Sequence, residues 1–175
     1  IEAMIADTMP PGYRFEADAN AVAADVLGKS TWAVLALTLD IELFTQLHYR
    51  QSIDADGALS PLFKDVFLFH WKEESQHAIL DELELKRHDA GIGAEERDRA
   101  VDDFIDLVGA VDGILQAQAE ADTEYFAANG GRAVSDGEAK VVEACFLEAY
   151  RWQYIHSGAR HPRFIEVMAG LITED

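Results

Sequence analysis

The sequence is poor in the residues that make covalent links or thiolate metal sites. Cys145 is its only cysteine, so we expect neither a disulfide within the chain nor a cysteine cluster for zinc or an iron–sulfur centre. A lone thiol suits a reducing compartment, and we predict a cytoplasmic protein. Long apolar runs are missing as well, since the longest, from Trp32 to Leu39, is interrupted by Thr38 and is too short to span a bilayer. The first residues also lack the basic-then-apolar pattern of a signal peptide.

Positive charge is scarce. The chain has 14 lysine and arginine residues against 33 aspartate and glutamate residues, which gives a formal net charge of −19. Such a chain repels nucleic acid and anionic membrane surfaces, and we expect neither as a partner. The length of 175 residues and the hydrophobic content of 49% predict a single domain, residues 1–175, with a sizeable core.

Proline is rare and unevenly placed. None occurs in the hundred residues between Pro61 and Pro162, a distribution typical of long helices. Few segments alternate between apolar and polar residues, so we predict no sheet. The predicted fold class is all-α, with long amphipathic helices packed in one bundle.

Turn and cap residues divide the chain into predicted helices, and residues 1–17 are expected to be irregular. The first helix spans about residues 20–52, with a break at Gly28 and a new N-cap at Ser30. The second spans about residues 60–88 and begins at Ser60-Pro61. A third helix ends at Asn129-Gly130-Gly131, a fourth is capped by Ser135, and a short segment follows Pro162.

The predicted second helix carries ionisable side chains on its apolar face. Its apolar stripe runs from Leu62 through Phe67 and resumes at Leu80. At helical spacing the same stripe passes through several ionisable positions: His70, Glu73 or Glu74, His77 and Asp81. Burying such groups costs several kcal/mol each unless they are paired or bind a metal.

Glu74 and His77 form a Glu-x-x-His motif. Residues three apart are neighbours on a helix, so the carboxylate and the imidazole can bind one ion together. Glu42, on the preceding predicted helix, lies 32 residues before Glu74 and 35 before His77. This context strengthens a motif that by itself arises often by chance.

The second half of the chain resembles the first. Aligning His77 with His156 places Glu74 on Gln153 and pairs Trp71 with Tyr150. Counting back 33 residues from Gln153 reaches Glu120, which nearly repeats the spacing of the first half. The pattern indicates a duplicated helix pair.

On these residues the chain resembles the ferritin-like superfamily, which includes bacterioferritins, rubrerythrins and carboxylate-bridged di-iron oxygenases. The resemblance covers about residues 30–160 and implies a four-helix bundle with a crossover between helices 2 and 3, predicted over residues 89–102, and a short C-terminal helix. It implies a metal site in which two helices each give a Glu and two each give a Glu-x-x-His. The implied ligands are Glu42, Glu74, His77, Glu120 and His156.

Two features depart from the family pattern. Gln153 stands where the family has its fourth glutamate. The loss of this carboxylate makes the site less anionic, so the number of bound metal ions can be one or two. His70 precedes Glu74 by four residues, and the resulting His-x-x-x-Glu-x-x-His is similar to the arylamine N-oxygenases, although there the extra histidine precedes the second motif. We therefore include His70 as a candidate ligand. His70 and His156 have the alternative role of hydrogen-bonded core histidines.

The ligand on the third helix is open among three acids. The repeat alignment favours Glu120, the apolar stripe of that helix extrapolates to Asp122, and Glu124 lies on a side lined by alanines. Around the site, Glu73 and Asp81 are candidates to orient the ligands. The histidines without motif context are expected at the surface: His48, His88 and His161.

Oxygen and nitrogen ligands without thiolate suit iron or manganese ions as the cofactor. The resemblance implies an oxygen-dependent oxidoreductase, which acts on a small molecule and uses dioxygen. A homodimer is a candidate assembly. The alternatives are iron binding or storage without turnover, and a ferritin-like scaffold whose metal site is degraded at Gln153. The substrate is not specified by any residue pattern.

Overall fold

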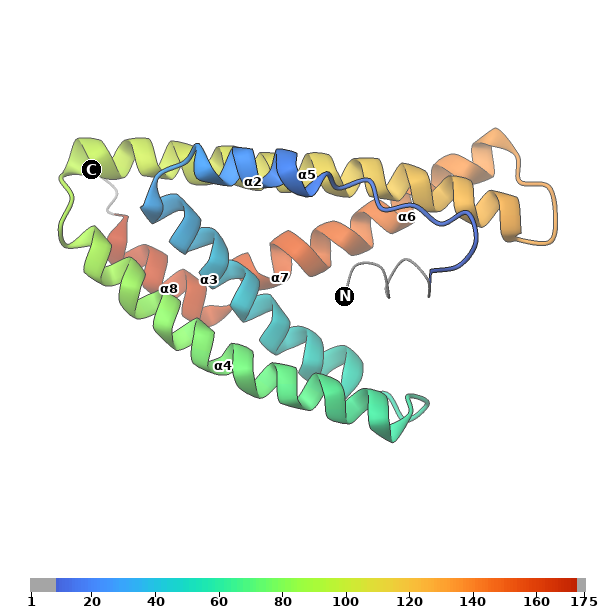
Figure 1. Cartoon of the computed structure of the whole chain (residues 1–175), viewed down its shortest axis with the longest axis horizontal. Coiled ribbons are helices and arrows are strands. Elements are labelled where there is room, and N and C mark those ends of the chain that lie inside the picture. The colour runs from blue at the N-terminus through green and yellow to red at the C-terminus, as the bar shows by residue number, and fades with distance from the viewer. Residues whose placement is uncertain (1–8, 173–175) are drawn as a thin grey trace.

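The computed structural model describes residues 9–172, which contain helices and no strand, so the predicted all-α class is confirmed. Residues 1–8 of the predicted irregular segment lie outside this range, and residues 9–18 are not helical. The helices are α2 (Ala19–Leu27), α3 (Thr31–His48), α4 (Pro61–Asp89), α5 (Ala94–Asn129), α6 (Asp136–Arg151), α7 (Ser157–Ala159) and α8 (Pro162–Leu171), with π-helical turns η1 (Tyr49–Ile53) and η2 (Trp152–His156) (Figure 1). None of these helices combines the length and the apolar character that crossing a membrane requires.

Local cap chemistry sets the starts of α3, α4 and α6, as predicted. The Ser30 hydroxyl accepts the main-chain N–H of Ala33, and Ser60 caps α4 directly before a proline in its first turn. Ser135 and Glu138 form a reciprocal capping box at the start of α6. Each cap satisfies N–H groups that have no partner inside the helix.

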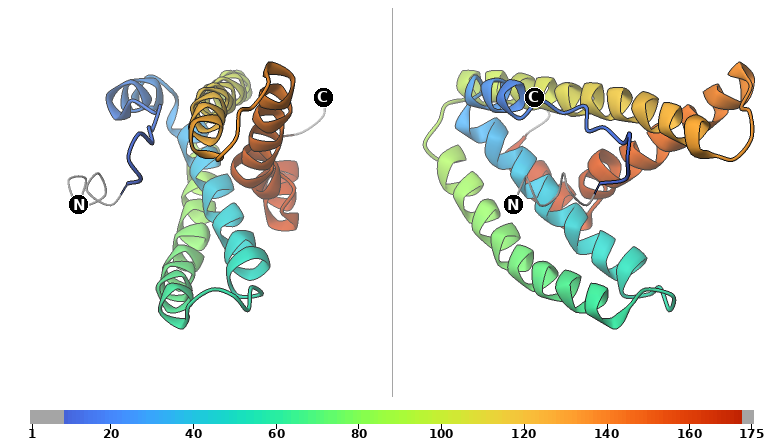
Figure 2. Two further views of the ribbon diagram at one scale, coloured as in Figure 1. Left: turned by 90° about the vertical axis from the view of Figure 1, so that its right-hand side faces the viewer. Right: turned by 45° about the vertical axis from the view of Figure 1, so that its right-hand side comes forward.

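The helices form two antiparallel hairpins, α3–α4 and α5–α6. Helix α4 packs antiparallel along one side of α3, whereas α5 packs across its N-terminal half and pairs with α6 (Figures 1 and 2). Within the described range, α4 and α5 do not pack along each other. They diverge from the short turn between Asp89 and Ala94, and α8 lies beside α3 and α4.

The segment predicted as a return crossing, residues 89–102, consists of this turn and the first turns of α5. That detail of the prediction is wrong because no proline breaks the chain after Ala94, and the interior of α5 accommodates Gly109 and Gly113. The four long helices are therefore arranged as a V rather than side by side (Figure 2).

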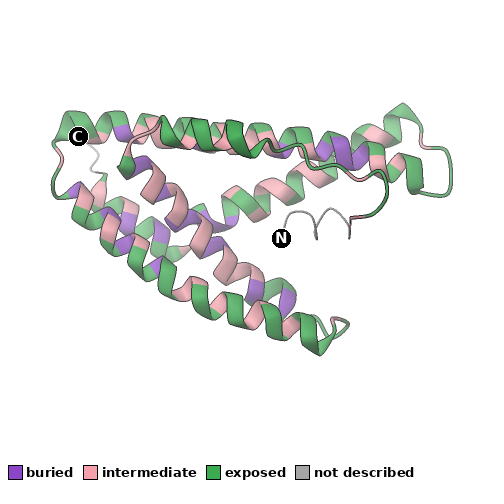
Figure 3. Cartoon of the chain, in the orientation of Figure 1, coloured by how far each residue is buried: buried purple, intermediate pink, exposed green. Residues whose placement is uncertain are grey.

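The core lies between α3, α4, α8 and the first turns of α5. Trp32, Leu39, Leu85 and Val167 are fully buried there, and buried residues gather along α3 and the sides of the helices that face it (Figure 3). The buried Asp89 carboxylate accepts the indole N–H of Trp32 at 3.0 Å and the guanidinium of Arg97 at 2.6 and 2.9 Å. These bonds link the starts of α3 and α5 to the end of α4, so they fix the direction in which α5 leaves the turn.

Candidate metal centre

Three of the predicted ligands meet between α3 and α4. Glu42, Glu74 and His77 each offer one ligand atom, and these atoms lie within 4.8 Å of one another. The Nδ1 atom of His77 lies 2.7 Å from Glu74 Oε2 and 3.9 Å from Glu42 Oε1. Among residues 9–172 this is the one such group of histidine and acidic side chains.

Helix geometry explains the meeting. Glu74 and His77 lie three residues apart on α4 and therefore share one face. Glu42 approaches that face from the antiparallel helix α3. The two carboxylate side chains are 16% and 15% exposed, whereas the His77 side chain is 46% exposed. The group is therefore shielded on its carboxylate side and open to solvent on its imidazole side.

The pKa values of the two carboxyl groups shift in opposite directions. Burial raises the pKa of Glu42 to about 8, and the neighbouring Glu74 adds to this rise. Burial also acts to raise the pKa of Glu74, but hydrogen bonds with Glu42 and His77 outweigh it, and the pKa of Glu74 falls below its usual value. The hydrogen bond to Glu74 raises the pKa of His77.

One atom of the group has no hydrogen-bond partner. Glu42 Oε2 is buried and makes no hydrogen bond within the described part of the chain. A buried acceptor without a partner costs about 1–3 kcal/mol, and more if it is charged. A metal ion bound to Glu42 would remove that cost.

Two further predicted residues flank the group. The Nε2 atom of His70 lies 2.8 Å from Glu74 Oε1, the oxygen that His77 does not contact. His70 therefore orients Glu74 in this structure. Asp81 lies one turn beyond His77, and its pKa is raised by burial, while the Thr38 hydroxyl and the His77 ring act in the opposite direction.

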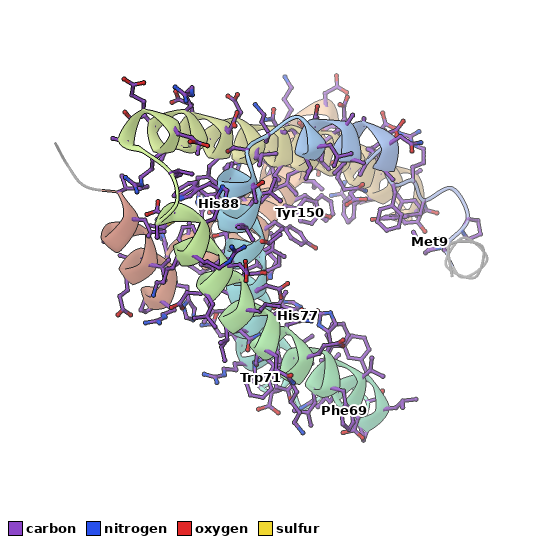
Figure 4. All side chains as sticks on the ribbon, turned by 60° about the vertical axis from the view of Figure 1, so that its left-hand side comes forward. Met9, Phe69, Trp71, His77, His88 and Tyr150 are labelled. Carbon is purple, nitrogen blue, oxygen red and sulfur yellow. The ribbon has the colours of Figure 1, made fainter. Side chains whose placement is uncertain are left out.

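The structure does not bring Glu120 and His156 to this group. Both side chains are exposed, on α5 and at the end of η2. Figure 4 shows His77 on α4 and Tyr150 of α6 on separate arms of the molecule. The buried acid on this part of α5 is Asp122, which accepts hydrogen bonds from Gln118 at 2.9 Å and from the Tyr150 hydroxyl. Glu124 is exposed and pairs with Arg14.

A cavity of about 290 Å³ borders the group on the side of His70. Its walls are largely aromatic, with polar residues from α3, α4 and η2 between the rings. The lining residues are Phe44, Thr45, His48, Tyr49, Phe67, His70, Trp71, Gln153 and Tyr154.

His48 belongs to this cavity, although the sequence suggested a surface position. Its Nδ1 atom lies 3.0 Å from Oε1 of Gln153, which joins α3 to η2. The two residues lie 105 positions apart, and no pattern of spacing in the sequence predicts that they meet. Gln153 thus faces the cavity rather than the Glu42 group.

No protein-family model, curated protein or solved structure matches this chain.

Proposed function

We propose that the protein binds one divalent transition-metal ion per chain, iron or manganese, through Glu42, Glu74 and His77. The observation that carries the proposal is the convergence of these three side chains, in which Glu42 Oε2 is buried without a partner. Carboxylate and imidazole donors without thiolate suit these two metals. The negative charge of the chain favours the approach of any cation.

We infer that the α3–α4 hairpin corresponds to one metal-binding helix pair of the ferritin-like superfamily. It carries one Glu and one Glu-x-x-His, which is half of the ligand set of that superfamily. The corresponding positions of the other half are Glu120, Gln153 and His156, which lie away from the group. One ion per chain, rather than two, follows from this division.

The proposed activity is an oxygen-dependent oxidation of a small molecule. A bound iron or manganese ion would supply the electron-transfer chemistry with dioxygen. Glu42 and Glu74 hold it on the shielded side, and His70 fixes the orientation of Glu74. The aromatic cavity beside His70 has room for a small apolar substrate.

The homodimer that we propose would form along α4. Large apolar side chains at helical spacing stay exposed on the side of α4 opposite α3: Leu62, Val66, Phe69, Leu80 and Leu83. The stripe is interrupted only by Glu73 and Gln76, and exposed apolar side chains gathered on one helix face mark an interaction surface.

An anaerobic titration tests the metal proposal and the activity separately. Metal-free protein is titrated with Fe²⁺ or Mn²⁺, and elemental analysis after desalting counts the retained ions. Saturable binding of one ion per chain is expected. Subsequent exposure to air, with oxygen consumption followed over many turnovers in the presence of candidate substrates, distinguishes an oxidase from a protein that only stores the metal. Absence of metal binding would exclude both the oxidase and the storage role, and a scaffold without a metal site would remain.

A further inference from the structure

A second cavity lies on the other arm of the molecule, between α5, α6 and the segment before α2. It has a volume of about 480 Å³, and five aromatic rings surround one acid. The rings belong to Tyr13, Tyr125, Phe126, Phe146 and Tyr150, and the acid is Asp122. The cavity shares no lining residue with the one beside His70.

The rings form two walls. The Tyr13 and Tyr125 rings meet edge to face with centroids 5.4 Å apart, and the Phe146 and Tyr150 rings are stacked at 6.1 Å. Each wall combines residues with a rigid apolar body, and the π faces of such rings carry partial negative charge. Asp122 lies between the walls and adds a carboxylate to them.

Specific bonds hold the wall that comes from the N-terminal segment. The Gln118 side chain donates to the main-chain oxygen of Arg14 at 3.0 Å and accepts the main-chain N–H of Glu16 at 3.1 Å. Arg14 also pairs with Glu124 on α5 at 2.8 Å. These contacts hold the residues directly after Tyr13 against α5, and Gln118 also donates to the Tyr13 hydroxyl.

Asp122 is buried without a cationic partner. The residue is 6% exposed, and its oxygens accept from the neutral donors Gln118 and Tyr150. Within residues 9–172 no salt bridge joins Asp122 to a lysine, arginine or histidine. A carboxylate in such a place is costly unless a positive charge approaches it. A cationic ligand that enters the cavity would supply that charge.

We propose that this aromatic cage binds a small organic cation that carries a quaternary ammonium group. Such a cation offers no N–H donors, so it is recognised by aromatic faces and by a nearby carboxylate rather than by a set of hydrogen bonds. A bare metal ion would instead need several oxygen ligands, and the cage lining supplies one carboxylate. The net charge of −19 raises the local concentration of cations around the site.

Choline and its uncharged carbon analogue, 3,3-dimethylbutan-1-ol, test the proposal because they share one shape and differ in charge. Binding to the full chain is measured by calorimetry and by saturation-transfer NMR at low salt. We expect choline to bind at least about tenfold more tightly than the neutral alcohol, in line with the strength of desolvated cation–π contacts. Equal binding of the two, or no saturable binding of choline, would overturn the proposal.

Matched variants locate the site. Asp122→Asn and Tyr125→Leu should each weaken choline binding at least about tenfold, while Tyr125→Phe, which keeps the ring, should stay close to wild type. Glu120→Gln removes the same charge from the exposed face of α5 and should have little effect. If Asp122→Asn fails to fold, the two Tyr125 variants decide between the outcomes. His77→Ala should bind choline normally, so the cage is tested independently of the metal centre.

Discussion

Gly158 of α7 lies directly against Asp40 of α3. A methyl group placed on Gly158 would overlap the main-chain oxygen of Asp40 and lie 2.5 Å from its Oδ1 atom. Both residues are buried, and Asp40 Oδ1 makes no hydrogen bond within the described residues. This close approach is how the C-terminal part of the chain packs on α3.

Substituting Gly158 by alanine should destabilise the fold. The new methyl group meets main-chain atoms, which cannot move aside as a flexible side chain would, and overpacking of this kind costs about 1–3 kcal/mol or more. Gly113→Ala is the matched control, because a methyl group there meets open space on α5 and should stabilise the helix by about 0.5–1 kcal/mol. Urea unfolding of both variants measures the difference, and equal stability would contradict the packing described for α7.

The stability of the metal-free protein should depend on the protonation of Asp40. Burial raises the pKa of Asp40 from 3.8 to about 7 in the folded chain. Below about pH 4 both states carry the proton, so the folded state bears no charge penalty. Between about pH 4 and 7 only the unfolded chain releases the proton, and stability is lost by roughly 2–4 kcal/mol in total.

Asp40→Asn removes this titration. The stability of the variant relative to wild type should therefore rise from about pH 4 to about pH 7 and then level off. Denaturant unfolding at several pH values in the presence of a chelator measures the relative stability. A difference that does not change with pH would show that Asp40 is ionised in the folded chain.

Substitutions of Glu42 and Glu120 should affect metal affinity differently, although the repeat alignment pairs the two residues. Glu42→Gln should weaken metal binding severely, because it removes a charged ligand from a shielded position between two helices. Glu120→Gln should leave metal affinity within about twofold of wild type, since the residue is exposed and outside the group. Calorimetric titration with Mn²⁺ compares the two, and a loss of affinity in both variants would support a site that closes over α5.

The apolar stripe of α4 predicts concentration-dependent association. Replacing Val66 and Leu83 together by asparagine should raise the dimer dissociation constant at least about tenfold, because both side chains lie in the exposed stripe. Ile165→Asn alters an equally exposed apolar residue on α8 and serves as the control. Light scattering over a range of concentrations reports the mass. A monomeric wild-type protein would exclude the homodimer.

The helices were predictable because their limits depend on local chemistry. Ser30, Ser60 and Ser135 each cap a helix through a bond to a residue three positions later, and such bonds can be inferred from sequence. The angle between α4 and α5 depends instead on the contacts of Asp89 with Trp32 and Arg97, and the first of these joins residues 57 positions apart. No pattern along the chain specifies that contact, so the crossing over residues 89–102 was wrongly predicted.

The site divides in the same way. Helical spacing alone places Glu74 beside His77, and the length of a hairpin brings Glu42 to them. Ligands from the second half of the chain could be predicted only by comparing distant segments. The repeat alignment favoured Glu120, whereas the apolar stripe of α5 indicated Asp122. Because α5 is one continuous helix, the stripe keeps its phase and Asp122 is the buried residue. The π-helical turn from Trp152 to His156 adds a further change of phase, which a count in ordinary helical steps does not include.

The most direct test of the account is an anaerobic Fe²⁺ titration of metal-free wild type, His77→Ala and His156→Ala, with circular dichroism as a check of folding. Wild type and His156→Ala should each bind one ion per chain with similar affinity, whereas His77→Ala should stay folded and lose at least about tenfold in affinity. The account would be contradicted if wild type bound no ion, or if His77→Ala bound as tightly as wild type.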